Sequence, residues 1–99
     1  MKKTYPLSAE VWLYSGMAAW HFLTLPTETA QQIDHIFHLS KRGWGSLRVT
    51  VTIGRTSWQT SIFPDKKSNS YLLPLKAEVR KKESIKVGDE IDFRLEISD

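Results

Sequence analysis

The alternation of apolar and polar residues over positions 47–53 limits what this chain can fold into more than any other feature of its sequence. The apolar positions are Leu47, Val49, Val51 and Ile53, and the polar positions between them are Arg48, Thr50 and Thr52. A period of two places one set on each face of a β-strand. The segment therefore predicts a half-buried strand, and Gly54-Arg55 predicts a two-residue hairpin turn into a partner strand over 56–63.

The same period recurs in segments that predict strands over 7–14, 18–25, 71–75 and 91–97. The first two flank Ser15-Gly16, a turn signal, and so form a second predicted hairpin. Trp12 and Tyr14 give its first strand an aromatic second face. Pro74 predicts that its strand ends at an edge or a bend of the sheet, because proline cannot donate to a neighbouring strand.

Two segments change to helical periodicity. Pro26 ends the second strand, Thr27 is a suitable N-cap, and apolar residues then recur three or four positions apart. This pattern predicts one helix over about 28–39. Residues 76–82 predict a short second helix of one or two turns.

About six strands, joined mostly by short turns, bury their inner faces best by curling round a shared core. We therefore expect a mainly β protein, a small closed or nearly closed β-barrel with one inserted α-helix and a short second helix. A β-sandwich is the alternative. A length of 99 residues fits a single domain over 1–99.

Composition excludes several classes of function. The chain has no cysteine, which excludes a disulfide framework, a thiolate metal site and a cysteine nucleophile. It has no Gly-x-Ser-x-Gly elbow and no glycine-rich phosphate loop, so we expect no cofactor. No apolar run approaches the roughly 20 residues that span a bilayer, and residues 1–6 lead into alternating sequence rather than into a signal peptide. We therefore expect a cytoplasmic protein without a membrane partner.

Three polar segments are candidates for ligand binding. In the glycine-rich loop over 40–46, Lys41 and Arg42 stand beside Trp44, and two cations next to an indole suit a phosphate and a ring. The alternative is that Trp44 closes one end of the barrel while Lys41 and Arg42 pair with the last carbonyls of the helix.

The second candidate segment is the loop after the strand that ends at residue 63, where Asp65 precedes Lys66 and Lys67. Asp65 could orient a lysine or accept a proton from a ligand, or it could cap a turn of its own backbone. The third segment is the short helix, where Lys76, Arg80 and Lys81, with Lys82 and Lys86 nearby, form a basic stripe suited to phosphates. A solvated helix face explains the same residues.

The histidines suggest metal binding or proton transfer, but the sequence shows no full set of residues for either. His35 and His38 lie three apart on the predicted helix, but no third ligand is evident, so we predict no metal site. His21 lies in a predicted strand, where a partly buried, hydrogen-bonded imidazole is the usual outcome. As a general base it would need an acidic partner that the sequence does not reveal.

Several strings together resemble a small bacterial and archaeal family known as domain of unknown function 1905. They are Ala19-Trp20-His21-Phe22, Arg42-Gly43-Trp44-Gly45-Ser46, Ser61-Ile62-Phe63-Pro64-Asp65-Lys66 and Tyr71-Leu72-Leu73-Pro74-Leu75-Lys76. The resemblance covers nearly the whole chain and implies a small closed β-barrel with one inserted helix. It implies no activity, because this family has no established biochemistry from which site residues could be transferred. Some members are joined to a helical region associated by name with bacteriocin protection, and because this sequence ends at Asp99 we expect no function that depends on that region.

We therefore expect a non-catalytic binding module for an anionic or aromatic small molecule, or for a protein. The expected ligand-binding residues lie in loops and at strand ends, where function is usually found, and they are Lys41, Arg42, Trp44, Asp65, Lys66, Lys67, Tyr71, Lys76 and Arg80. The net charge of +3 and the basic stripe keep a nucleic-acid-binding barrel as the alternative. An enzyme that uses His21 or Asp65 for proton transfer is the third hypothesis.

Overall fold

The computed structural model describes residues 1–16 and 20–99. In chain order its strands are β1 (Lys2–Glu10), β2 (Trp12–Leu13), β3 (His21–Thr24), β4 (Leu47–Ile53), β5 (Thr56–Asp65), β6 (Ser70–Pro74) and β7 (Glu90–Ser98). They form one sheet in the order β1-β7-β4-β5-β6-β3-β2, and every neighbouring pair is antiparallel. The mainly β character predicted from the sequence is confirmed.

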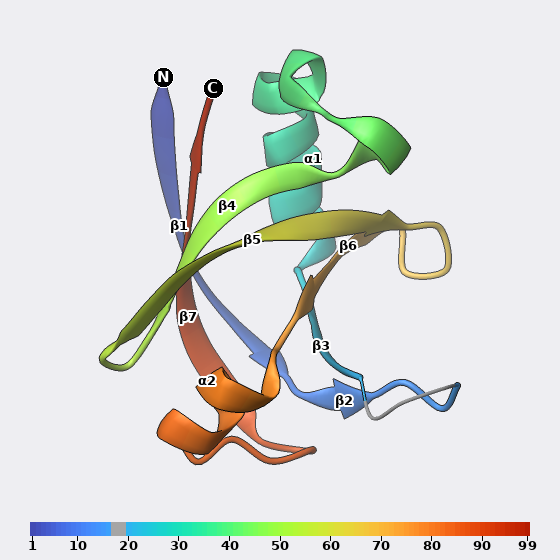
Figure 1. The fold of residues 1–99 in the computed structure, drawn as a ribbon. Helices are drawn as coiled ribbons and strands as arrows, with labels where there is room; N and C mark the ends of the chain where they lie inside the picture. The colour runs from blue at the N-terminus through green and yellow to red at the C-terminus, as the bar shows by residue number, and fades with distance from the viewer. Residues whose placement is uncertain (17–19) are drawn as a thin grey trace.

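The sheet curls into an open half-barrel of seven strands, so the expectation of a closed or nearly closed barrel with about six strands is wrong (Figure 1). The extra strand arises because the strand predicted over 7–14 is two strands that change partner at Val11. The Val11 N–H donates to the carbonyl of Asp89 over 2.9 Å, and its carbonyl accepts from the N–H of Gly88 over 2.8 Å. Before Val11 the chain pairs with β7, and after it the chain pairs with β3. The two ends of the sheet, β1 and β2, are therefore consecutive pieces of one ribbon.

The strand predicted over 47–53 is confirmed as β4, with its apolar positions buried. It pairs with β5 across the Gly54-Arg55 turn and with β7 on its other side, so that Val51 lies opposite both Trp58 and Leu95. Gly54 has a φ of +57°, a left-handed conformation that glycine adopts without the penalty other residues meet. The hairpin prediction is therefore confirmed.

The other predicted strands are present with shifted ends. β3 corresponds to the segment predicted over 18–25, of which residues 18 and 19 lie outside the described residues. β5 continues to Asp65, two residues past its predicted end, because Pro64 and Asp65 still pair with β6. Extension of β5 and β6 shortens the loop between them.

The predicted helix over 28–39 is confirmed as α1 (Thr27–Phe37), which continues into the 3-10 turn η1 (His38–Ser40). The prediction that Thr27 caps the helix is wrong. Pro26 occupies the cap position with an extended backbone and no side-chain hydrogen bond, and Thr27 is the first helical residue.

The short second helix is confirmed as α2 (Ala77–Lys82), and the glycine-rich loop contains a further tight turn, η2 (Gly43–Gly45). In Figure 1, α1 stands behind β4 and β5 at one end of the sheet, whereas α2 lies at the opposite end, near the β2–β3 hairpin. None of the helices in the described residues has the length and apolar character needed to cross a bilayer.

One apolar cluster fills the inside of the curled sheet. The strands contribute alternate residues, α1 contributes Ala30, Ile33 and Phe37, and α2 contributes Val79. The two ends of the chain lie side by side on β1 and β7 (Figure 1).

Candidate functional site

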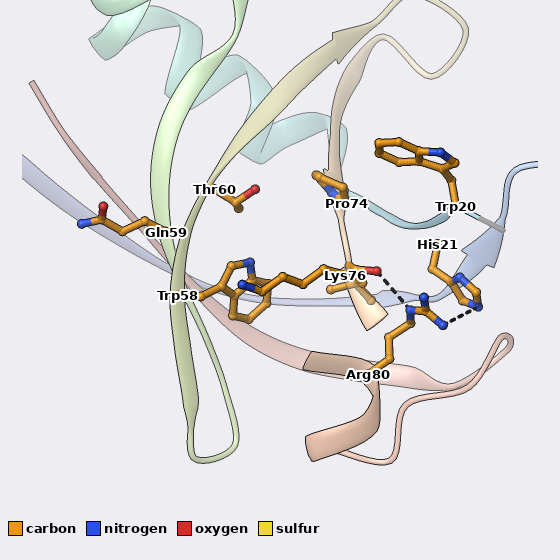
Figure 2. Close-up of a pocket in the computed structure, with 9 residues that line it drawn as sticks. Trp20, His21, Trp58, Gln59, Thr60, Pro74, Lys76 and Arg80 are labelled. Carbon is orange, nitrogen blue, oxygen red and sulfur yellow. Dashed lines mark hydrogen bonds between the residues drawn. The ribbon is translucent and has the colours of Figure 1, made fainter. Parts of the chain in front are cut away.

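A pocket of about 370 Å³ lies where β3, β5 and the junction between β6 and α2 come together. Figure 2 shows the side chains around it. The pocket is lined by Trp20, His21, Trp58, Gln59, Thr60, Pro74, Leu75, Lys76 and Arg80. We call it the basic pocket. Its lining residues come from three separate stretches of the chain, so only the folded sheet assembles it.

Two hydrogen bonds hold Arg80 in position at the pocket wall. Its Nε donates to the backbone carbonyl of Leu75 over 3.1 Å, and one terminal nitrogen donates to Nε2 of His21 over 3.4 Å (Figure 2). Because a guanidinium has donors and no acceptor, Nε2 of His21 is the acceptor in this contact. A guanidinium carries about five N–H donors, so these bonds leave it able to donate to a ligand as well.

The basic pocket carries positive charge from two side chains. Lys76 stands directly before α2 and Arg80 lies one helical turn later, so both side chains reach the same side of the helix. In Figure 2 the Lys76 side chain extends across the pocket toward Trp58. None of the described residues that line this pocket is acidic. The balance of charge therefore favours an anion.

Two indole rings complete the basic pocket. Trp58 is half-buried and packs against the core, whereas Trp20 is 52% exposed. Trp20 stacks on Phe22, with ring centroids 5.9 Å apart and an angle of 21° between the ring planes. Indoles beside fixed cations can hold a ligand ring while the cations hold an anionic substituent.

A larger hollow of about 650 Å³ adjoins the basic pocket at Trp20, which lines both. We call it the aromatic hollow, and its lining consists of Trp12, Leu13, Tyr14, Ser15, Trp20, Phe22, Asp65, Lys67 and Leu72. Phe22 is central, because its ring centroid lies 5.2 Å from that of Trp12 and 6.5 Å from that of Tyr14. The Trp12 indole is fixed by a hydrogen bond of 2.8 Å to the Thr24 hydroxyl.

The nine residues predicted from the sequence are not all brought together. Lys76 and Arg80 meet in the basic pocket, and Lys67 with Asp65 lines the aromatic hollow. Four of the nine surround a third hollow of about 150 Å³ beside α1, and they are Lys41, Asp65, Lys66 and Tyr71.

Asp34 of α1 organises the third hollow. Lys41 Nζ lies 3.0 Å from Asp34 Oδ1, and the buried Tyr71 hydroxyl donates to the same oxygen. Lys41 Nζ is also 5.6 Å from the centroid of the Tyr71 ring. Lys41 thus pairs with a carboxylate side chain rather than with the helix carbonyls that one interpretation of the sequence assigned to it.

The same three side chains shift two pKa values. Burial raises the pKa of the Tyr71 phenol, and its hydrogen bond to Asp34 acts in the same direction. The hydrogen bond with Tyr71 raises the pKa of Lys41, and the contact with Asp34 adds to the rise although burial opposes it. Tyr71 is only 2% exposed, so it ties β6 to α1 and offers little surface to a ligand.

Asp65 caps a turn of its own loop. Its Oδ2 accepts from the Ser68 N–H over 3.1 Å and from the Ser68 hydroxyl over 2.7 Å. The turn-capping interpretation of Asp65 is therefore confirmed. Whether it also contacts a ligand stays a prediction.

Arg42 and Trp44 stand apart from these hollows. Arg42 lines a fourth hollow of about 300 Å³ together with Arg48 and Glu96. Trp44 is 95% exposed and has a φ of +64°, so the interpretation that it closes one end of the barrel is wrong. The strained backbone of η2 presents this indole to solvent.

Sequence reasoning missed Trp20 and Trp58 as lining residues of the basic pocket. For His21 it expected a partly buried, hydrogen-bonded imidazole, which the contact with Arg80 confirms, but it did not place His21 in a ligand pocket. The available signal was the period of two, which places Trp20 and Phe22 on one side of their strand and groups the aromatic residues of β2 and β3. The pairing of Phe22 with Pro74 brings these rings to the start of α2. The pattern of apolar residues in either strand does not determine how the two strands align.

Comparison with known proteins gives a family and no activity. No curated protein matches the chain. The model of one family, described as "Domain of unknown function (DUF1905)", matches residues 8–95 of the 99. The matched range contains every residue that lines the basic pocket and the aromatic hollow. The resemblance noted in the sequence is thus confirmed over most of the chain, which belongs to the DUF1905 family.

Proposed function

We propose that this protein is a non-catalytic binding module that takes a small aromatic anion in the basic pocket. The observation that carries the proposal is that Lys76 and Arg80 meet two indoles in a pocket whose described lining residues include no carboxylate. The anionic group would lie between the two cations, and the ring would lie against Trp20 or Trp58. A volume of about 370 Å³ is suitable for a small ligand.

The contacts of the two groups considered for proton transfer favour binding over catalysis. Nε2 of His21 accepts a hydrogen bond from Arg80, and the Asp65 carboxylate accepts two from Ser68. A general base must be free to reach the proton that it removes. Both groups instead support the local structure that shapes the pockets.

Phenyl phosphate is the ligand that tests the proposal. Its melting-temperature shift should grow with concentration, because a ligand that binds only the folded state stabilises that state. Benzylamine has a similar ring and the opposite charge, and it should give no shift. Absence of any shift with phenyl phosphate, or an equal shift with benzylamine, would overturn the proposal.

Lysine variants then locate the site. Lys76→Gln should weaken binding of phenyl phosphate by about threefold to tenfold in calorimetry, because a charge-assisted contact is lost. Lys81→Gln is the matched control, since Lys81 is exposed on α2 and does not line the basic pocket. Equal losses in the two variants would point to general surface charge.

Single-stranded nucleic acid is the second candidate, and the exposed Trp44 favours it. Its indole stands two residues from Arg42, and Arg42 shares a hollow with Arg48. Such indoles stack on bases while arginines contact phosphates. Oligothymidylate should then quench tryptophan fluorescence, and raising the salt should weaken the binding steeply. No binding even at low salt removes this candidate.

A further inference from the structure

We infer that the ligand of the basic pocket is amphipathic, with its anionic ring in that pocket and an apolar tail in the aromatic hollow. The inference rests on the proposed function, because it describes the rest of the same ligand. Trp20 carries it, since this one side chain lines both spaces. A ligand that passes over the exposed part of the Trp20 indole occupies both spaces without any change in the fold.

The aromatic hollow exposes apolar side chains that are adjacent in the structure. Leu13, Tyr14 and Trp20 are 47%, 50% and 52% exposed. All three line the hollow. The Tyr14 N–H donates to the Trp20 carbonyl over 2.9 Å, which places Tyr14 and Trp20 beside each other on the face of the β2–β3 hairpin that also carries Trp12 and Phe22. Single exposed apolar residues are ordinary, but a contiguous group beside a pocket marks a surface that binds something apolar.

The wall of the aromatic hollow is already in place before a ligand arrives. Phe22 contacts the rings of Trp12, Tyr14 and Trp20, and the Thr24 hydroxyl fixes the Trp12 indole. A preformed wall lowers the ordering entropy that binding has to overcome. With about 650 Å³ against about 370 Å³ for the basic pocket, the hollow has room for a tail larger than the head ring.

Charge sets the direction in which the ligand lies. The aromatic hollow has one cation and one carboxylate among its described lining residues, Lys67 and Asp65. The basic pocket has Lys76 and Arg80 with no carboxylate among its described lining residues. The anionic head is therefore drawn to the basic pocket, and the uncharged tail is left for the hollow.

Titration calorimetry with phenyl phosphate and 4-hexylphenyl phosphate, kept below the micelle concentration, tests the inference. The hexyl chain should raise the affinity about tenfold or more, because it buries apolar surface on the aromatic wall. Leu13→Ser and Tyr14→Ser should each remove a large part of this gain while leaving the affinity for phenyl phosphate unchanged. Leu39→Ser is the matched control, because Leu39 is 89% exposed and lines neither space.

The outcomes separate this inference from the function on which it rests. If phenyl phosphate binds and the hexyl chain adds nothing, the inference is overturned and the proposed function stands. If neither compound binds, both are overturned. Sedimentation velocity tests the alternative that a second copy of the chain occupies the hollow. The inference is overturned if the wild type is a dimer, Leu13→Ser is a monomer, and the hexyl chain still raises the affinity of Leu13→Ser as much as that of the wild type.

Discussion

Arg80 donates to His21 at the wall of the basic pocket over 3.4 Å while its Nε donates to the Leu75 carbonyl over 3.1 Å. One side chain therefore joins the start of β3 to the segment between β6 and α2. The same side chain supplies half of the fixed positive charge of the pocket. A substitution of Arg80 should accordingly change both the stability of the fold and the affinity for the ligand. A substitution of Lys76 should change the affinity alone.

Arg80→Lys keeps the charge and removes the planar set of donors. We expect the free energy of unfolding to fall by about 1 kcal/mol because two hydrogen bonds are weakened or lost. Affinity for phenyl phosphate should fall about fivefold as the cation loses its fixed place. Urea unfolding and calorimetry measure the two effects. Lys76→Gln is the comparison, and it should lower the affinity for phenyl phosphate without changing the free energy of unfolding. If Arg80→Lys has the wild-type affinity and the wild-type stability, the double role of Arg80 is contradicted.

Glu83 joins the end of α2 to the β4–β5 turn, so its removal should lower the stability of the fold. Its Oε2 accepts from the Thr56 hydroxyl over 2.7 Å and from the Arg55 N–H over 3.4 Å. Glu83→Ala should lower the free energy of unfolding by about 1 to 2 kcal/mol. Glu78→Ala, which breaks only an exposed ion pair of 3.6 Å with Lys82 on the same helix, should change it by less than about 0.5 kcal/mol.

Gly54 makes the same contact testable from the opposite side. A Cβ at this position would lie 2.2 Å from Glu83 Oε1, so the carboxylate would have to move and give up its hydrogen bonds. Gly54→Ala should therefore destabilise the wild-type chain more than it destabilises the Glu83→Ala variant, where about 1 to 2 kcal/mol of left-handed strain remains. Gly88→Ala gives the strain alone, since φ is +93° and no described atom lies within 4 Å of an added Cβ. Equal costs of Gly54→Ala in both backgrounds would refute the coupling.

The difference between what could and could not be predicted follows from the range of the interactions. β4 was predictable because a half-buried strand carries both faces in its own seven residues. The change of partner at Val11 was not, because it depends on bonds to Gly88 and Asp89 at the other end of the chain. The expected strand over 7–14 therefore appears as two strands, β1 and β2, with different partners.

The candidate site divides in the same way. Lys76 and Arg80 were predicted as part of one basic stripe, because they lie close together in the sequence of a short helix. Their meeting with Trp20 and Trp58 depends on the register of β6 against β3 and β5, which local patterns do not determine. The glycines that flank Trp44 indicated an unusual backbone at this position, but the pattern could not show whether the indole faced the core or the solvent.

Tyr71 and Tyr5 make a matched pair, because one phenol is bonded and the other is not. Tyr71→Phe removes the hydrogen bond to Asp34 and should lower the free energy of unfolding by about 1 to 2 kcal/mol near neutral pH. The Tyr5 hydroxyl is buried without a partner among the described residues, so Tyr5→Phe should leave stability unchanged or raise it by about 1 kcal/mol. A loss in Tyr5→Phe as large as that in Tyr71→Phe would show that the Tyr5 hydroxyl has a partner.

Alkaline titration gives a further test of the contact between Lys41 and Tyr71. The pKa of Tyr71 is raised above 10.0 and that of Lys41 above 10.5, so the folded chain keeps protons that the unfolded chain has released. Their stabilisation is present below these values and is lost as the pH rises through the folded pKa values. Tyr71→Phe should make the fall in stability above about pH 10 shallower in urea unfolding. Tyr5→Phe should also make this fall in stability shallower, because burial raises the Tyr5 pKa. If Tyr5→Phe changes the slope of stability against pH and Tyr71→Phe does not, the raised pKa of Tyr71 is contradicted.

Trp44→Gly should stabilise the protein although it deletes the largest side chain of its loop. The indole is 95% exposed and contributes little burial, whereas its φ of +64° lies where a residue with a Cβ is strained. Glycine relieves that strain, and after the greater freedom of the unfolded chain is allowed for, the free energy of unfolding should rise by about 0.5 to 1 kcal/mol. Trp44→Ala keeps the strain and should change it by less than about 0.5 kcal/mol. Both variants should bind phenyl phosphate as the wild type does, because Trp44 does not line the basic pocket. A loss of that binding would place Trp44 in the ligand site after all, whereas a loss of oligothymidylate binding alone would assign the strained indole to nucleic acid.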